Sequence, residues 1–104
     1  MDDVITLVAE SFVKNEFGVD VPVQLPHEVF AEIKSISRQE FFAAGRNGLN
    51  PQFQATVFAG DYNGETICRY NGDQYSVYRA YWIPGSDYVE LYVERKGGSN
   101  NGQT

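Results

Sequence analysis

The stretch Val89-Glu90-Leu91-Tyr92-Val93-Glu94 decides the fold class, because its three aliphatic residues alternate strictly with the others. A period of two is typical of a strand that has one buried and one solvated face. We therefore predict a strand here, with the aliphatic side chains in the core. Glu90 and Glu94 are expected on the solvated face.

Similar segments lie upstream, at residues 19–25, 27–36, 53–59, 65–70 and 74–83. Turn signals separate them. Asn-Gly pairs at 63–64 and 71–72 tolerate the positive φ of tight hairpins, and Pro84-Gly85-Ser86-Asp87 forms one more turn. Short strands joined by tight turns predict a mainly β fold, a small antiparallel barrel or sandwich of about six to seven strands.

The side chains of these strands can be assigned to faces from the same alternation. Residues 29, 31 and 33 should share one face, with Phe30 and Ile36 on the other. Residues 53, 55, 57 and 59 should line another inward face. In the aromatic segment 74–83, the odd-numbered residues Tyr75, Val77, Tyr81 and Ile83 are expected opposite the even-numbered ones.

The N-terminal part is less decisive. Residues 4–14 are β-branched but mixed in pattern, and Asn15-Glu16-Phe17-Gly18 resembles a turn. Two interpretations stay open: a hairpin with residues 19–25, or a short helix over 4–14. Pro22 cannot donate to a strand ladder, so its strand should lie at an edge or carry a bulge.

One short helix interrupts the strands. Ser37-Arg38-Gln39-Glu40 fits a capping box, in which the Ser37 hydroxyl accepts from the Glu40 N–H and the Glu40 carboxylate reaches back. Gly45 is positioned to end the helix in the left-handed conformation. Residues 37–52 thus form a long helix-containing excursion between two strands.

Composition limits the remaining possibilities. At 104 residues the chain suits one domain, which we assign to 1–96, and the Gly/Asn-rich residues 97–104 should be disordered. No apolar run is long enough for a membrane span, and the acidic start is unlike a secretory signal. The single cysteine, Cys68, excludes an internal disulfide and is expected to fill the core.

The sequence offers no residue set for catalysis, and we predict neither an enzyme, nor a cofactor, nor a metal site. The one histidine, His27, has no partner at a useful spacing. The segment 61–65 has oxygen-bearing residues but lacks the remaining ligand positions of a calcium loop. Neither a phosphate-binding glycine loop nor a nucleophile elbow occurs.

An alternative from another class is a small-barrel module that binds single-stranded nucleic acid or peptide. Its stacking platform would come from Tyr70, Tyr75, Tyr78, Tyr81 and Trp82. The net charge of −6 argues against phosphate binding, and only Arg69 and Arg79 lie among these aromatics. Exposure in a cationic groove would favour this alternative, whereas burial would exclude it.

The order of several segments resembles the head–tail joining (head-closure) proteins of tailed bacteriophages. The resemblance spans roughly residues 4–95. The segments that carry it are 28–41 (EVFAEIKSISRQEF), Ala44-Gly45, Gly48-Leu49-Asn50-Pro51, Asp61-Tyr62-Asn63-Gly64-Glu65, Tyr75-Ser76-Val77-Tyr78-Arg79 and Val89-Glu90-Leu91-Tyr92.

The resemblance implies a small barrel with a long inserted loop or helix, and a structural role in the virion. Copies would form a ring beneath the portal and its adaptor, close the filled capsid and offer a docking face to the tail. The expected location is the head–tail interface of the virion, or the host cytoplasm during assembly or when a prophage encodes the protein. The chain alone could stay monomeric, and DNA would pass the acidic ring without specific binding.

The excursion is the expected place for a subunit or portal interface, since a ring needs two different complementary surfaces. The candidate residues are Phe41, Phe42, Arg46, Leu49, Pro51 and Phe53. Most of these side chains are apolar, which is unusual for a surface loop unless something covers them. These side chains either form the interface or cover the end of their own barrel.

Overall fold

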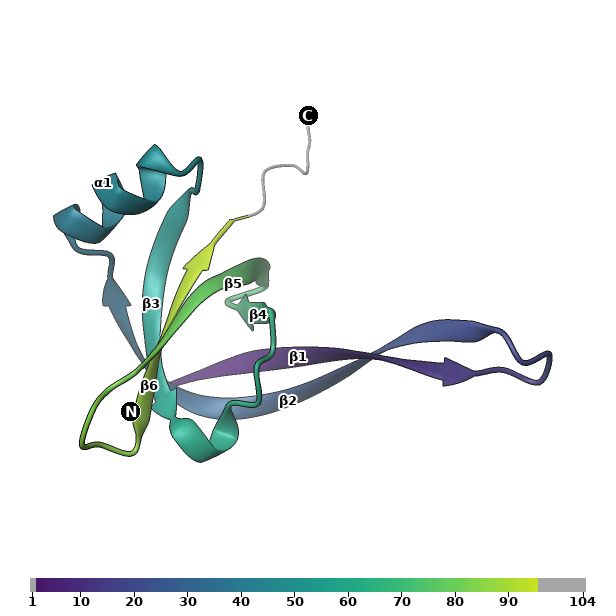
Figure 1. The fold of residues 1–104 in the computed structure, drawn as a ribbon. Helices are drawn as coiled ribbons and strands as arrows, with labels where there is room; N and C mark the ends of the chain where they lie inside the picture. Colours follow the sequence, from purple (N-terminus) through teal and green to yellow (C-terminus); the bar gives the residue numbers. More distant parts are fainter. Residues whose placement is uncertain (1, 96–104) are drawn as a thin grey trace.

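Six antiparallel strands form a closed barrel in the computed structural model, which describes residues 2–95 (Figure 1). Around the barrel the order is β1-β2-β3-β6-β5-β4. The strands are β1 (Asp3–Lys14), β2 (Asp20–Ser35), β3 (Pro51–Phe58), β4 (Ile67–Tyr70), β5 (Asp73–Trp82) and β6 (Tyr88–Glu94). The predicted β class is confirmed, and the barrel replaces the sandwich alternative. The predicted disorder of 97–104 and the domain end at 96 lie outside the described residues.

The barrel interior is filled by the residues that the alternation assigned to it. Leu91, Val89 and Val93 of β6 are fully buried, and Ala55 and Val57 of β3 pack beside them. Cys68 is also fully buried, as predicted. Because each strand pairs with both of its neighbours around the barrel, the core-facing rows meet at the barrel axis and exclude water.

The N-terminal segment is a hairpin, so the helix alternative for residues 4–14 is wrong. β1 pairs with β2 over its whole length, and the two segments predicted at 19–25 and 27–36 are one continuous strand. Pro22 and Pro26 are accommodated because the other edge of β2 is unpaired until Ala31 meets β3. The edge position predicted for Pro22 is therefore confirmed.

Half of this hairpin projects beyond the barrel. β1 pairs with β4 only at Thr6, Leu7 and Val8, so residues 9–25 pair only among themselves. We call residues 9–25 the arm; Figure 1 shows it as a twisted ribbon that leaves the barrel on one side. At its tip, the Asn15 side-chain carbonyl accepts hydrogen bonds from the N–H groups of Phe17 and Val19.

One predicted hairpin is wrong and another is confirmed. β3 does not turn back at 61–64; it ends in a short 3₁₀ helix, η1 (Ala59–Asp61), and pairs with β2 and β6 instead of β4. The turn at Asn71-Gly72 does join β4 to β5, with φ of 53° and 83° at its two residues. Both values suit a type I′ hairpin.

The faces of β5 also differ from the expectation. A bulge between Val77 and Arg79 shifts the register against β6. Tyr75 and Val77 pack on the core before the bulge, and Ala80 packs on it afterwards. A bulge adds one residue and reverses the alternation, so the single odd-numbered face predicted for 74–83 is wrong.

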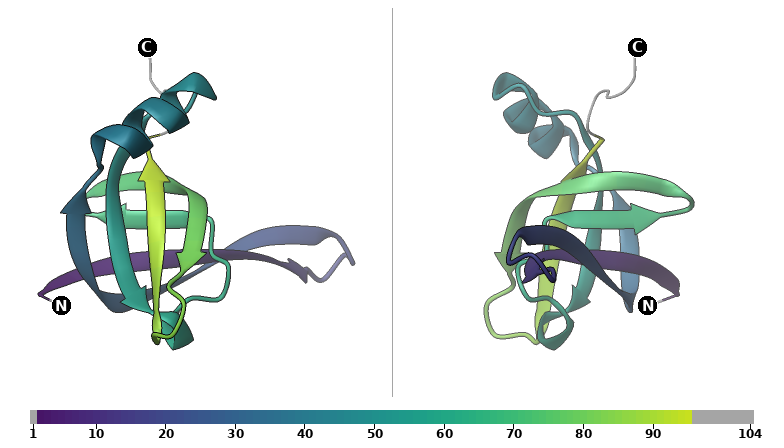
Figure 2. Two further views of the ribbon diagram at one scale, coloured as in Figure 1. Left: turned by 60° about the vertical axis from the view of Figure 1, so that its left-hand side comes forward. Right: turned by 90° about the vertical axis from the view of Figure 1, so that its right-hand side faces the viewer.

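The helix α1 (Arg38–Arg46) stands at the end of the barrel where β3 begins (Figure 2). The Ser37 hydroxyl accepts a hydrogen bond of 3.1 Å from the Glu40 N–H, as predicted. Gly45 does not end the helix, because α1 runs one residue further and Gly48 takes the positive φ of 78°. No helix within residues 2–95 is long and apolar enough to cross a membrane.

Truncating a leucine should lower the free energy of unfolding much more in the barrel than in the arm. Leu91→Ala removes a fully buried side chain and should cost about 2–5 kcal/mol of unfolding free energy. Leu25→Ala, on the arm, should cost no more than about 0.5 kcal/mol because Leu25 is already exposed. Urea denaturation of both variants measures this, and equal losses would contradict a barrel core that excludes the arm.

Burial raises the pKa of the Cys68 thiol from 9.0 to about 12. Between these values the unfolded chain loses the thiol proton while the folded chain keeps it, so stability should fall as pH rises above about 9. This group contributes a slope of up to about 1.4 kcal/mol per pH unit. Cys68→Val should show a correspondingly shallower loss in alkaline urea denaturation, and identical slopes would contradict the assignment.

Candidate interaction surfaces

Exposed apolar side chains are the most unusual feature of the described residues. Soluble monomers rarely keep large contiguous apolar patches in water, and such patches usually mark binding surfaces. Most of these side chains belong to the arm, to α1 or to one end of the barrel. The exposed large hydrophobic residues are Val4, Phe12, Val13, Phe17, Val19, Leu25, Phe30, Phe41, Phe42, Phe58, Tyr81, Trp82 and Tyr88.

The first surface is the outward face of α1. At 100° per residue, Arg38, Phe41, Phe42, Gly45 and Arg46 fall on one side of the helix. The rings of Phe41 and Phe42 lie 5.9 Å apart edge to face and remain 49% and 59% exposed. These phenylalanines therefore do not cover the end of their own barrel; we call this set the α1 face.

The other predicted interface residues lie deeper. Leu49 is half-buried, Pro51 is buried, and Phe53 belongs to the core, where its ring contacts Tyr70 and Tyr75 at 5.4 and 4.9 Å. Within the monomer, Pro51 and Phe53 thus support the excursion from below and present little surface. Phe41, Phe42 and Arg46 are the accessible part of the predicted set.

Glu40 holds α1 on the barrel. Its carboxylate accepts a hydrogen bond of 2.7 Å from the Tyr78 hydroxyl. It also forms an ion pair with the Arg79 guanidinium at 2.6 Å. The second half of the predicted capping box is therefore replaced by this contact with β5. The Arg79 guanidinium also lies 4.0 Å above the ring of Tyr92, a cation–π geometry.

The surroundings of this contact raise the pKa values of its two tyrosine hydroxyls. Burial, followed by the hydrogen bond to Glu40, raises the pKa of Tyr78, and burial with the nearby Glu90 raises the pKa of Tyr92. Tyr92 is buried although it lies on the outer side of β6. The Glu90 carboxylate accepts a hydrogen bond of 2.8 Å from the Tyr92 hydroxyl, and the Glu94 carboxylate accepts one of 3.1 Å from the Asn50 N–H. Both glutamates lie on the outer face, as predicted, but each also binds a neighbouring residue.

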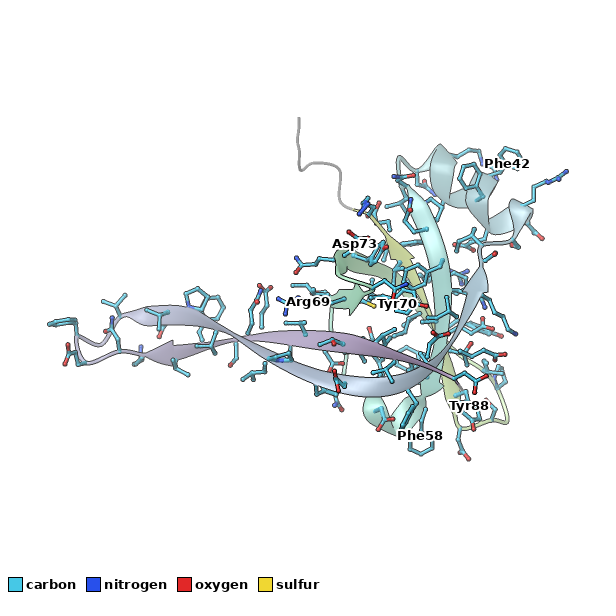
Figure 3. The ribbon with its side chains drawn as sticks, turned by 180° about the vertical axis from the view of Figure 1, so that it is seen from behind. Phe42, Phe58, Arg69, Tyr70, Asp73 and Tyr88 are labelled. Atoms are coloured by element: carbon cyan, nitrogen blue, oxygen red, sulfur yellow. The ribbon has the colours of Figure 1, made fainter. Side chains whose placement is uncertain are left out.

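The second surface crosses the outside of the barrel at the end away from α1. Val4 is opposite Phe30, and Phe58 is opposite Tyr88, in the strand register. The pairing of Ala31 with Val57 brings Phe30 beside Phe58. Four neighbouring strands thus contribute one exposed row, which we call the belt; Figure 3 shows Phe58 and Tyr88 at the opposite end of the barrel from Phe42.

The third surface is one face of the arm. Residues paired directly across a ribbon share a face, and all three pairs on this face are uncharged. They are Ala9–Leu25, Ser11–Val23 and Val13–Val21. These odd-numbered positions continue the row of Ile5 and Leu7, which is buried inside the barrel. The arm therefore carries a core-type face with no second sheet over it.

The aromatic platform of the alternative function is divided by the structure. Tyr70 and Tyr75 pack against the core, Tyr78 is half-buried, and Tyr81 and Trp82 are exposed. The two nearby cations are engaged elsewhere: Arg69 donates to Gln24 and Gln74, and Arg79 binds Glu40. The exposed pair thus lies outside any cationic groove formed by these two arginines.

His27 has a partner that its sequence spacing did not reveal. Its Nε2 lies 3.5 Å from the buried Glu65 carboxylate and 3.1 Å from the Asp61 carbonyl oxygen. Glu65 also accepts the Asn63 N–H at 2.7 Å and so fixes the loop after η1. Within residues 2–95 no group of three or more histidine, cysteine or carboxylate residues could hold a metal ion.

No protein-family model matches this chain, and no curated protein matches its sequence.

Replacing Glu40 should loosen α1. Glu40→Gln removes the charge from the contact with Tyr78 and Arg79, and a double-mutant cycle with Tyr78→Phe should give a coupling of about 1–2 kcal/mol in urea denaturation. The matched control is Glu32→Gln, an exposed carboxylate 4.0 Å from Lys34, which should change stability by less than about 0.5 kcal/mol. Zero coupling would contradict the role of Glu40.

Proposed function

We propose that this protein is a structural component of a tailed phage virion that joins the head to the tail. Copies form a ring beneath the portal and its adaptor, close the DNA-filled capsid and offer a docking face to the tail. The observation that carries the proposal is the presence of three separate apolar surfaces, the arm, the α1 face and the belt, on one small barrel. The protein acts by assembly and not by catalysis.

The number and position of the surfaces support a ring. A head-to-tail ring uses two different surfaces of each subunit, and further contacts above and below need additional ones. The belt lies at the opposite end of the barrel from α1. It is thus available to a component on one side of the ring while the arm and α1 serve neighbours within it.

Charge supports passage of DNA without binding. The chain has a net charge of −6, and Arg69, Arg79 and Arg95 are engaged by neighbouring residues. Proteins that grip the phosphate backbone need a cationic surface. A ring of such subunits repels DNA along its channel and lets it slide.

The proposal can be tested by affinity capture of the tagged protein from cells that produce the encoding phage. Mass spectrometry should identify portal or adaptor and tail proteins with the wild type. A Phe41→Asp/Phe42→Asp variant should lose at least one of these partners, because a carboxylate on the α1 face cannot be buried against a neighbouring copy without cost and the ring that binds them is weakened. Lys34→Asp, an exposed change on the barrel wall, should retain them.

A different outcome would assign another function. If the wild type retains nucleic acid and no capsid or tail protein, head–tail joining is excluded. The exposed Tyr81 and Trp82 would then be tested as a stacking platform by fluorescence quenching with single-stranded oligonucleotides.

A further inference from the structure

The arm lacks the layer that would complete it. A two-stranded ribbon is at best marginally stable in water, and its apolar face needs a cover. The uncharged face formed by Ala9, Ser11, Val13, Val21, Val23 and Leu25 has no second sheet of the described chain over it; Val13 and Leu25 are exposed and the other four are half-buried. At the tip, Phe17 is 79% exposed. A partner is needed to cover this face.

The α1 face has the properties of such a cover. Phe41 and Phe42 provide the apolar contact, and Gly45 lies between them and Arg46 on the same side. A Cβ at Gly45 would meet nothing within 4 Å, so nothing in the described monomer requires a glycine there. A glycine within a helix costs about 0.5–1 kcal/mol relative to alanine, and a close external contact would account for it.

The arm as a whole and the α1 face carry opposite net charges, although the charged side chains of the paired arm strands, Glu10, Lys14 and Asp20, lie on the face opposite the uncharged one. The arm carries Glu10, Glu16 and Asp20 against Lys14, a net charge of −2. Lys14 and Asp20 pair at 3.0 Å, and within residues 2–95 neither Glu10 nor Glu16 has an ion-pair partner. The α1 face carries two arginines, Arg38 and Arg46, and no acid, a net charge of +2, since Glu40 points to the barrel.

The two surfaces also match in size and position. Nine helical residues span about 13 Å, and the six-residue strands of the arm span about 20 Å. The arm and α1 leave the barrel on opposite sides, as Figures 1 and 3 show from front and back. One molecule therefore cannot bring its own arm onto its own helix, whereas a neighbouring copy can.

We infer that the arm of each copy packs its uncharged face on the α1 face of the next copy; this inference rests on the proposed ring. Val13, Val21 and Val23 contact Phe41 and Phe42 in this arrangement. Arg38 and Arg46 then lie within about a Debye length of the acidic arm, so its net negative charge attracts them without direct ion pairs. The contact is head-to-tail, so it propagates from copy to copy until a ring closes.

Disulfide trapping with purified protein tests this contact. Cys68 is buried, so a cysteine introduced at the surface is the reactive one. Val13→Cys places a thiol on the arm and Gly45→Cys places one on the α1 face. Mixed under mild oxidation at high protein concentration, the two variants should give a mixed dimer. The Val13→Cys/Gly45→Cys double variant should give a ladder of covalent oligomers.

Controls separate the contact from random collision. Asp87→Cys, in the exposed turn between β5 and β6, should give at least tenfold less mixed dimer with Val13→Cys. Adding Arg38→Glu and Arg46→Glu to Gly45→Cys should reduce the yield several-fold. Adding Glu10→Arg and Glu16→Arg to Val13→Cys should restore it. Circular dichroism melting checks that each variant is folded.

Each outcome has a distinct meaning. Homodimers of Val13→Cys alone, at the yield of the mixture, would indicate an arm-to-arm contact and overturn the inference. So would a mixed yield no higher than that of the Asp87→Cys control. Because the experiment contains no phage partner, trapping that succeeds while affinity capture finds no portal or tail protein would retain the contact and reject head–tail joining.

Discussion

The short pairing between β1 and β4 is the constraint on which the structure depends. Three residue pairs, Thr6–Arg69, Leu7–Cys68 and Val8–Ile67, close the sheet into a barrel and remove its edges. Closure places Leu7 and Cys68 in a filled interior. It also uses only the first half of β1. The remaining half must continue outward with β2, so the same contact that completes the core also creates the arm.

Local sequence patterns predicted the strands and the start of the helix well. The alternation in 89–94 and the hydroxyl of Ser37 act over a few residues, and both expectations are met in the structure. These local patterns do not predict which strands pair when they lie far apart in the sequence. The Asn63-Gly64 signal suggested a hairpin, but β3 pairs with β2 and β6 and not with β4. The bulge after Val77 and the continuation of α1 past Gly45 likewise depend on tertiary packing.

The accessible surfaces were only partly predictable. Phe41 and Phe42 stood out because they follow a helix cap, where an apolar pair needs a partner. The same reasoning included Phe53, which instead packs against Tyr70 and Tyr75. The sequence does not predict the arm and the belt as exposed surfaces, because an alternating apolar strand predicts a buried face whether or not anything covers it. Strand length was the available signal, since strands of 12 and 16 residues exceed what a small barrel needs.

The two prolines of β2 have a consequence for colloidal behaviour. Pro22 in the arm and Pro26 directly after it lie on the free edge of β2 and offer no N–H to an incoming strand, whereas β1 has no proline along the arm. Fibrillar aggregation requires that each added strand present a fresh template for the next one. An arm that accepts a strand along one edge and refuses it along the other ends such growth after a single addition. A free molecule that has not yet met its partner is therefore protected against becoming a seed for amyloid.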